Sequence, residues 1–308
     1  MMDILYNMKI GMIGLSEGNG HPYSFSAIFN GFNEKLMKEA WPNIYKYLVK
    51  QDKKSFGIPN AKVTHIWTQD MSLSKKIAKA SYIENIVLNF EDMLDSVDAV
   101  IIARDDYETH MKYSKIFLEN CKYVFIDKPL SLEMKELEYF YPYLKSGQLM
   151  SCSSMRYAPE LDMIKIEKTN NFKLIRGTVA KDWEKYAIHI LEGIYSIIEF
   201  DIESVYANES QFESVTIYRK NNMILSIDAL NGGPSMIKFD FFTEIDYFEA
   251  NTLNAFVAFK RTMEAFIDMS NTNIQPIEPE LTINLMKVIK AQKKSVIEKR
   301  KVYLSEII

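Results

Sequence analysis

Cysteine and histidine are both scarce in this sequence. Cys121 and Cys152 are the only two cysteines among 308 residues, too few for a disulfide framework or a cysteine-rich zinc site. The four histidines are scattered and lack the spacing typical of metal ligands, so we predict no metal site. These absences exclude a small fold that is held together by disulfides or by zinc.

An excess of basic residues is also missing. The net charge is −4, with 37 Lys and Arg against 41 Asp and Glu, so we expect no nucleic-acid partner. No apolar run reaches the roughly 18 residues that are needed to cross a bilayer. Residues 1–15 lack the basic-then-apolar order of a signal peptide. We therefore expect a cytoplasmic protein without a membrane partner.

Apolar residues, by contrast, are plentiful, and at 47% of the chain they suffice for two hydrophobic cores. In the first half, short apolar runs alternate with helical segments, a pattern typical of a doubly wound parallel sheet. The expected strands are Met8–Leu15, Val63–Thr68, Val97–Ala103 and Tyr123–Ile126. The expected helical segments are Ser24–Leu36, Leu73–Ala80, Glu91–Asp95 and Tyr107–Asn120.

After Ser151 the pattern changes to longer strands, which is typical of an antiparallel sheet. The expected strands are Lys173–Ala180, Val205–Glu209, Ser214–Arg219, Met223–Ala229 and Met236–Tyr247, with a hairpin turn at Asn221-Asn222. The expected helices are Tyr186–Phe200, Leu253–Met269 and Leu281–Lys299. We predict an α/β domain over residues 1–129 and an α+β domain over residues 130–308.

A glycine-rich turn, Gly14-x-Ser16-x-Gly18-x-Gly20, follows the first strand. Glycines let a backbone approach a phosphate, and a helix N-terminus supplies N–H groups and a positive dipole end. The spacing departs from G-x-G-x-x-G, so the turn is compatible with an ordinary loop as well as with dinucleotide binding.

The second strand should end in an acidic residue if it holds the adenosine ribose of NAD. Thr68 stands at that place, and Asp70 follows two residues later. Thr68 removes the charge that would repel a 2′-phosphate, so the expected cofactor is NAD or NADP. The distance from Gly20 to Thr68 is about twice the usual one of roughly 20 residues. Residues 33–60 therefore look inserted, as a lid or, more simply, as a solvated surface segment.

The tripeptide Asp127-Lys128-Pro129 follows the strand Tyr123–Ile126. Ligands of doubly wound sheets bind beyond the carboxyl ends of the strands. Pro129 favours an extended Lys128, and an ammonium aimed in this way can hydrogen-bond a substrate hydroxyl and ease its deprotonation. The alternative is a turn lysine that points into water.

These segments resemble the Gfo/Idh/MocA family of oxidoreductases. Asp127-Lys128-Pro129 resembles the family's E-K-P, and the upstream VIIARDDYETHMKYSKIFLENCKYVF has His110 in the matching place. Arg104-Asp105-Asp106 replaces the family's T-P-N at the cofactor edge. Downstream, SSMRYAPE resembles the start of the second domain, and AFVAFKRTMEAFID resembles a C-terminal helix. The resemblance covers nearly the whole chain.

The resemblance implies a Rossmann domain and a second domain whose open, mostly antiparallel sheet forms homodimers or homotetramers. It implies NAD(P)-dependent hydride transfer at a sugar, nucleotide-sugar or polyol carbon. Lys128 and His189 carry over as catalytic residues. Lys185 stands where the family has an acid near the histidine, so Asp182, Glu184 or Glu192 is expected to supply the carboxylate.

The resemblance also gives the remaining candidate site residues. Lys128, Arg156, Lys185 and His189 are expected to bind substrate, although a structural ion pair is the simpler role for Arg156. His110 is expected to be structural or at the cofactor's edge. The expected cofactor-binding residues are Gly14, Ser16, Gly18, Gly20, Thr68, Asp70, Ala103, Arg104, His110, Asp127 and Lys128. Two alternatives stay open: a closed-cycle NAD-using epimerase or glycosidase, and a catalytically inactive dinucleotide- or sugar-binding protein.

Overall fold

The computed structural model describes residues 7–167, 172–251 and 254–308. Contacts divide the chain into two compact units. The first comprises residues 1–130, 138–151 and 259–277, and the second comprises residues 131–137, 152–258 and 278–308. The domain boundary that we expect between residues 129 and 130 stays a prediction.

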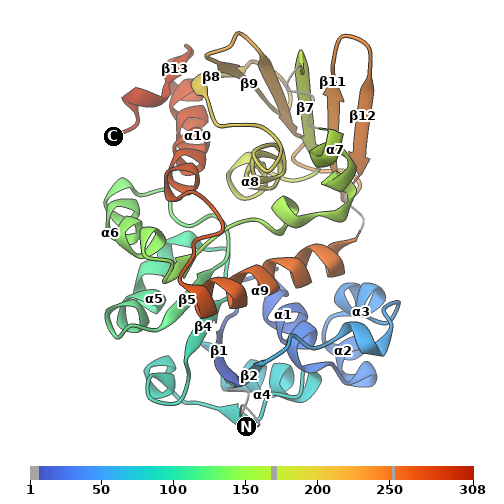
Figure 1. Ribbon diagram of the computed structural model, residues 1–308, viewed down its shortest axis with the longest axis vertical. Helices are drawn as coiled ribbons and strands as arrows, with labels where there is room; N and C mark the ends of the chain where they lie inside the picture. Colours follow the sequence, from blue (N-terminus) through green and yellow to red (C-terminus); the bar gives the residue numbers. More distant parts are fainter. Residues whose placement is uncertain (1–6, 168–171, 252–253) are drawn as a thin grey trace. The chain divides into compact units, whose positions relative to one another are not determined.

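The described part of the first unit contains a six-stranded parallel sheet (Figure 1). Its order is β3-β2-β1-β4-β5-β6, so the direction of winding reverses between β1 and β4, as in Rossmann folds. The predicted parallel sheet is therefore confirmed. The strands are β1 (Met8–Ile13), β2 (Ala61–Trp67), β3 (Asn85–Ile86), β4 (Ala99–Ile102), β5 (Tyr123–Ile126) and β6 (Leu149–Met150).

Helices pack on this sheet and cover its apolar strands. The helical segments are α1 (His21–Asn30), η2 (Phe90–Met93), α4 (Met71–Ala80), η3 (Tyr107–Thr109) and α5 (His110–Glu119). The single helix expected over Ser24–Leu36 is wrong. Gly31 ends α1 with a φ of 78°, and the side chain of Asn33 then caps a new helix, α2 (Glu34–Ala40).

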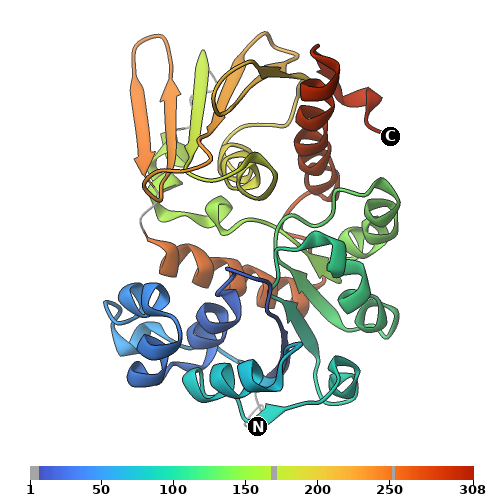
Figure 2. The ribbon, with the colours of Figure 1, turned by 180° about the vertical axis from the view of Figure 1, so that it is seen from behind.

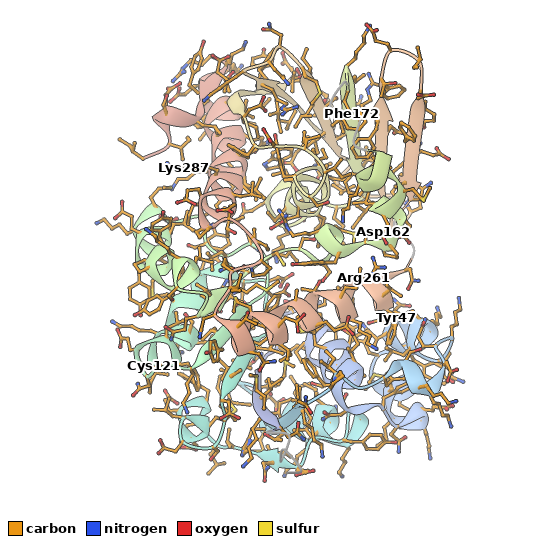
Figure 3. The ribbon with its side chains drawn as sticks, in the orientation of Figure 1. Tyr47, Cys121, Asp162, Phe172, Arg261 and Lys287 are labelled. Carbon is orange, nitrogen blue, oxygen red and sulfur yellow. The ribbon has the colours of Figure 1, made fainter. Side chains whose placement is uncertain are left out.

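Residues 33–60 form α2, α3 (Pro42–Leu48) and η1 (Lys53–Ser55), and most of their side chains are exposed or half-buried, as expected of a solvated surface segment. Helix α2 packs against α4, and α3 packs against α1. Met37 and Leu48 have no exposed surface, because the apolar positions of both helices face the unit's own helices. Tyr47, labelled in Figure 3, also lies on α3, and burial raises the pKa of its hydroxyl.

The described part of the second unit contains a seven-stranded sheet of order β12-β11-β7-β10-β9-β8-β13. Only β7 and β10 pair in parallel, so the predicted mostly antiparallel sheet is confirmed. The strands are β7 (Leu174–Val179), β8 (Ile202–Asn208), β9 (Glu213–Arg219), β10 (Ile224–Ala229), β11 (Ile237–Phe242), β12 (Tyr247–Asn251) and β13 (Val302–Tyr303).

Two turns decide the strand count of this sheet. Asn222 has a φ of 66° in the turn between β9 and β10, as predicted for the hairpin. The single strand expected over Met236–Tyr247 is wrong, because a turn closed by hydrogen bonds between Thr243 and Asp246 makes it the hairpin of β11 and β12 (Figure 1).

Helices α8 (Trp183–Ile194) and α10 (Pro279–Glu298) pack against each other and against the second sheet (Figure 2). Trp183 is fully buried there, and its indole N–H donates to the carbonyl of Ile289. The remaining helical segments are η4 (Ser154–Tyr157), η5 (Pro159–Leu161), α7 (Asp162–Glu167), η6 (Leu304–Glu306), and two helices that each contain a unit boundary, α6 (Met134–Lys145) and α9 (Ala255–Thr272). Leu253, the expected start of the last but one helix, lies outside the described residues.

Candidate active site

The carboxyl ends of β1, β4 and β5 gather the principal candidate residues of the first unit. The glycine turn follows β1, Arg104 and Asp105 follow β4, and Asp127 and Lys128 follow β5. Ligands of such sheets bind where the strand order reverses, which is here between β1 and β4. The topology therefore places the predicted cofactor residues at the expected edge of the sheet.

The glycine turn has the geometry of an anion cradle. A Cβ on Gly14 would lie 2.4 Å from Pro22 Cγ, and a Cβ on Gly20 would lie 2.7 Å from Cε2 of the Trp41 ring, so a side chain at either position would displace its neighbours. Gly18 has a φ of 76°, and no atom lies within 4 Å of its would-be Cβ. Within the described residues, the backbone N–H groups of Glu17, Gly18 and Gly20 have no acceptor. Open space above free N–H groups suits the phosphates of a dinucleotide.

A cavity of about 340 Å³ adjoins this turn within the first unit. Its lining is mostly apolar and includes Leu15 of the turn, together with Trp41 from the inserted residues 33–60. Lys76 and Lys79 of α4 supply positive charge at its wall. The inserted segment thus lies against the glycine turn and helps to shape the space beside it.

Asp127 ties the end of β5 to the glycine turn. Its carboxylate accepts hydrogen bonds from Asn19 Nδ2 (3.1 Å), His21 Nδ1 (2.5 Å) and the backbone N–H of Lys128 (2.9 Å), and it is 2% exposed. Burial alone would raise the pKa of Asp127, but His21, Lys128 and Asn19 outweigh burial and hold that pKa far below its usual range. Sequence reasoning did not identify Asn19 and His21 as partners of Asp127.

Lys128 is buried at 4% exposure and does not point into water. Its Nζ lies 3.9 Å from Asp105 Oδ2. Ser16 Oγ donates to Asp105 Oδ1 (2.5 Å) and accepts from the Asp105 N–H (3.1 Å). A polar chain therefore joins Ser16, Asp105 and Lys128 across the point where the strand order reverses.

Arg104 and Gln69 form a second link across this edge. Arg104 Nη1 donates to the carbonyl of Leu15 (3.2 Å) and to Gln69 Oε1 (3.1 Å), while Nε and Nη2 donate to Asp106. Gln69 also accepts from the N–H of Leu15 and donates to its carbonyl, so it holds both polar groups of one turn residue. Gln69 was not predicted, because its role depends on contacts between three strand ends.

Thr68 and Asp70, the two candidate ribose-binding residues at the end of β2, differ in exposure. Thr68 is 4% exposed, and its hydroxyl donates to the carbonyl of Asp70 and contacts Ser74 Oγ. The Asp70 carboxylate is exposed and caps α4 by accepting from the N–H of Ser72, which lowers the pKa of Asp70. Of these two residues, Asp70 is the one whose side chain faces solvent.

Ala103 and His110 lie inside the first unit. Ala103 donates its N–H to the carbonyl of Ile13 and so extends the pairing of β1 with β4. His110 is fully buried, and its two ring nitrogens lie 2.9 Å and 3.0 Å from the carbonyls of Leu130 and Arg104. His110 thereby joins the segments that follow β4 and β5.

His189 belongs to the second unit and lies on α8. Its Nδ1 is 2.6 Å from Oγ of Ser153, a residue that is 1% exposed. The three carboxylates expected near His189 have other partners: Asp182 caps α8 at the N–H of Lys185, Glu184 pairs with Lys293, and Glu192 pairs with Arg156. Lys185 itself is exposed.

Arg156 and Glu192 form a buried ion pair within the second unit. Arg156 Nε donates to Glu192 Oε2 at 2.5 Å, and Glu192 also accepts from the backbone N–H of Ser153. Burial raises the pKa of Glu192, and the neighbouring guanidinium opposes that shift. The Nη2 atom of Arg156 is buried without a hydrogen-bond partner among the described residues.

Neither a metal site nor a membrane-spanning helix is found among the described residues. They contain no group of three His, Cys, Asp or Glu side chains arranged to hold a metal ion, and no helix among them is both long and apolar enough to cross a membrane. Neither Cys121, labelled in Figure 3, nor Cys152 forms a disulfide within the described residues.

Strand order, an anion cradle after β1 and polar side chains beyond β4 and β5 define a dinucleotide-binding Rossmann protein. The model of the oxidoreductase family with an NAD-binding Rossmann fold, GFO_IDH_MocA, matches residues 8–152. The match covers slightly less than half of the chain and agrees with the resemblance seen in the sequence. The matched residues are therefore similar to an oxidoreductase family whose Rossmann fold binds NAD.

Solved structures share the fold over nearly the whole chain. A probable dehydrogenase from Thermotoga maritima is 16% identical, with a TM-score of 0.76 over 98% of this chain and 100% of that one. A putative myo-inositol dehydrogenase from Sinorhizobium meliloti is 13% identical, with a TM-score of 0.75 over 96% and 99%. A scyllo-inositol dehydrogenase from Lactobacillus casei, solved with NAD(H) and scyllo-inositol, is 15% identical, with a TM-score of 0.73 over 97% and 99%. No curated protein sequence matches the chain.

Proposed function

We propose that this oxidoreductase transfers a hydride between NAD and the hydroxyl-bearing carbon of a sugar, nucleotide-sugar or polyol. The observation that carries the proposal is the placement of Lys128. A buried ammonium, paired with Asp105, follows the strand next to the point where a dinucleotide would lie. Similarity of fold to inositol dehydrogenases supports a polyhydroxylated substrate.

NAD, when bound, accepts or supplies the hydride. In this proposal the free N–H groups of the glycine turn hold its phosphates, and Asp70, the solvent-facing residue at the end of β2, holds its ribose. Lys128 and His189 hold the reacting hydroxyl and handle its proton, with Arg156 and Lys185 as further substrate-binding candidates. Burial suits Lys128 to this role, because a desolvated ammonium interacts strongly with a single oxygen atom.

The oligomeric state, the cellular compartment and the use of NADP remain predictions from the sequence. We expect a homodimer or homotetramer in the cytoplasm. NADP is a further candidate, because the Thr68 side chain adds no charge that would repel a 2′-phosphate.

The test uses Lys128→Met, which removes the charge and keeps most of the volume. We expect NADH binding, followed by nicotinamide fluorescence, to weaken far less than turnover, because Lys128 is only one of several expected cofactor contacts. We expect the oxidation of myo-inositol, scyllo-inositol and a panel of sugars to fall by roughly 10²-fold or more, as for the loss of a general acid–base group. Lys115→Met, on the exposed surface of α5, is the matched control and should leave both unchanged.

Three outcomes count against the proposal. Unchanged turnover in Lys128→Met would refute the assigned role of that lysine. Substrate conversion without net change in NADH, together with a bound cofactor that does not exchange, would favour the closed-cycle epimerase or glycosidase. Failure of the folded wild-type protein to bind NADH or NADPH would favour a catalytically inactive sugar-binding protein.

A further inference from the structure

The hydroxyl of Ser153 has one acceptor within the described chain. Ser153 Oγ accepts from the backbone N–H of Met155 at 3.1 Å, and it lies 2.6 Å from Nδ1 of His189. A hydroxyl has a single hydrogen to donate, and among the described residues only His189 Nδ1 lies where it can accept that hydrogen. Donation from Ser153 to His189 is therefore the arrangement that gives the buried hydroxyl hydrogen an acceptor.

We infer that Ser153 is the positioning residue of His189 and fixes its neutral imidazole in the tautomer that carries the hydrogen on Nε2. A nitrogen that accepts a hydrogen bond has no hydrogen of its own, so in the neutral ring the hydrogen must be on the other nitrogen. Ser153 is 1% exposed, so water does not compete for its hydroxyl.

A buried ion pair holds Ser153 in place. The backbone N–H of Ser153 donates to Glu192, whose carboxylate pairs with Arg156. Glu192 follows His189 by three residues on α8, and residues three apart lie on the same face of a helix. The same face of α8 therefore binds both the backbone and the hydroxyl of Ser153, which fixes the distance from Oγ to the imidazole.

A serine partner reverses the polarity that a carboxylate partner would impose. A carboxylate accepts from Nδ1–H and leaves Nε2 as an unprotonated base. Ser153 donates to Nδ1 instead, so Nε2 presents a hydrogen. On the proposed function, His189 then holds the substrate oxygen as a hydrogen-bond donor, and proton exchange falls to Lys128.

The tautomer can be measured without cofactor or substrate. Two-bond ¹H–¹⁵N spectra of the ¹⁵N-labelled full chain, recorded near pH 8 where a histidine of ordinary pKa is neutral, distinguish protonated from unprotonated ring nitrogens. The chain has only four histidines, and the His189→Gln variant identifies the signals of His189. We expect Nδ1 to be unprotonated and Nε2 protonated. A protonated Nδ1 in the wild-type protein would overturn the inference.

Variants at residue 153 separate positioning from folding. Ser153→Ala should give a mixture of tautomers, and Ser153→Thr, which keeps the hydroxyl, should restore the wild-type pattern. The matched control is Ser151→Ala, because Ser151 is 2% exposed and its hydroxyl has no hydrogen-bond partner among the residues that the structure describes. Unchanged signals of the other three histidines show that each variant is folded. A Ser153→Ala spectrum identical to that of the wild type would also overturn the inference.

A kinetic comparison tests the consequence for the proposed reaction. Gln places an N–H donor near the position of Nε2, whereas Ala has none. We expect His189→Gln to retain about 10-fold more activity than His189→Ala, the value of roughly one hydrogen bond. Equal losses would refute the donor role. Because the tautomer is read from the free protein, failure of the proposed function would leave the NMR result standing.

Discussion

Replacing Asp127 with alanine removes an acceptor shared by three buried donors. Asn19 Nδ2, His21 Nδ1 and the Lys128 N–H would all lose their carboxylate. Each buried donor left without a partner costs about 1–3 kcal/mol, and His21, with 21% of its side chain exposed, lies at the low end of that range because water reaches it. We expect Asp127→Ala to lower the free energy of unfolding by about 3–5 kcal/mol.

Urea unfolding followed by circular dichroism measures this loss. The matched control is Glu84→Ala, which removes an exposed carboxylate that lies 2.5 Å from Lys62 Nζ, and it should leave the midpoint unchanged. The low pKa of Asp127 adds a pH test. A carboxylate whose pKa is lowered by folding stabilises the protein above its unfolded pKa, so the difference between wild type and variant should be full at pH 7. It should shrink below about pH 4.

The reasoning about Asp127 fails if the variant unfolds within about 1 kcal/mol of the wild type at pH 7, since that is less than the loss expected for even one stranded donor at the middle of its range. It also fails if the stability difference is constant from pH 7 to pH 3. Either result would mean that water satisfies the three donors when the carboxylate is absent.

Three further predictions concern individual residues. Gly18→Ala and Gly57→Ala each place a Cβ at a positive φ with open space around it, so each should lower the free energy of unfolding by about 1 kcal/mol. Only Gly18→Ala should weaken NADH binding in a fluorescence titration, and equal NADH affinities of the two variants would exclude the glycine turn from the cofactor site. Asp70→Asn keeps the cap of α4 and removes its charge, so NADH affinity should fall about 10-fold with unchanged stability, and an unchanged affinity would exclude Asp70 as the ribose acceptor. Arg156→Met leaves the buried Glu192 without its cationic partner and should lower the free energy of unfolding in urea by about 3–5 kcal/mol. The double variant Arg156→Met/Glu192→Met should recover much of that loss, and a double variant no more stable than the single one would contradict this reasoning.

Where local pattern decides the structure, the sequence was sufficient. The run Tyr123–Ile126 was predicted with the bounds that β5 has, because an apolar run between charged residues leaves little freedom. The split of Ser24–Leu36 into two helices was missed, although Gly31 and Asn33 carry the signals for an end and a cap. Helix α6 was not predicted, since Pro142 interrupts its pattern.

The hydrogen-bond partners of the site residues could not be predicted from the sequence. Topology predicted that the residues after β1, β4 and β5 would meet at one edge, because parallel strands share their carboxyl ends. It did not predict that Asn19 would bind Asp127, a residue 108 positions away, or that Gln69 would hold Leu15. Nor did it predict that Oγ of Ser153, 36 residues earlier in the chain, would lie 2.6 Å from Nδ1 of His189. Such choices depend on side-chain packing across elements, which no local spacing records.

The first unit takes residues 259–277 from near the end of the chain. Phe266 in that segment is fully buried, and its ring lies 5.8 Å from that of Phe125 on β5. A ribosome makes β5 long before it makes Phe266, so during synthesis one side of this apolar core stays exposed to solvent. The strand that precedes Lys128 then reaches its final packing only after residues 259–277 have emerged, and a chain that stops before them would present that uncovered surface to chaperones and proteases.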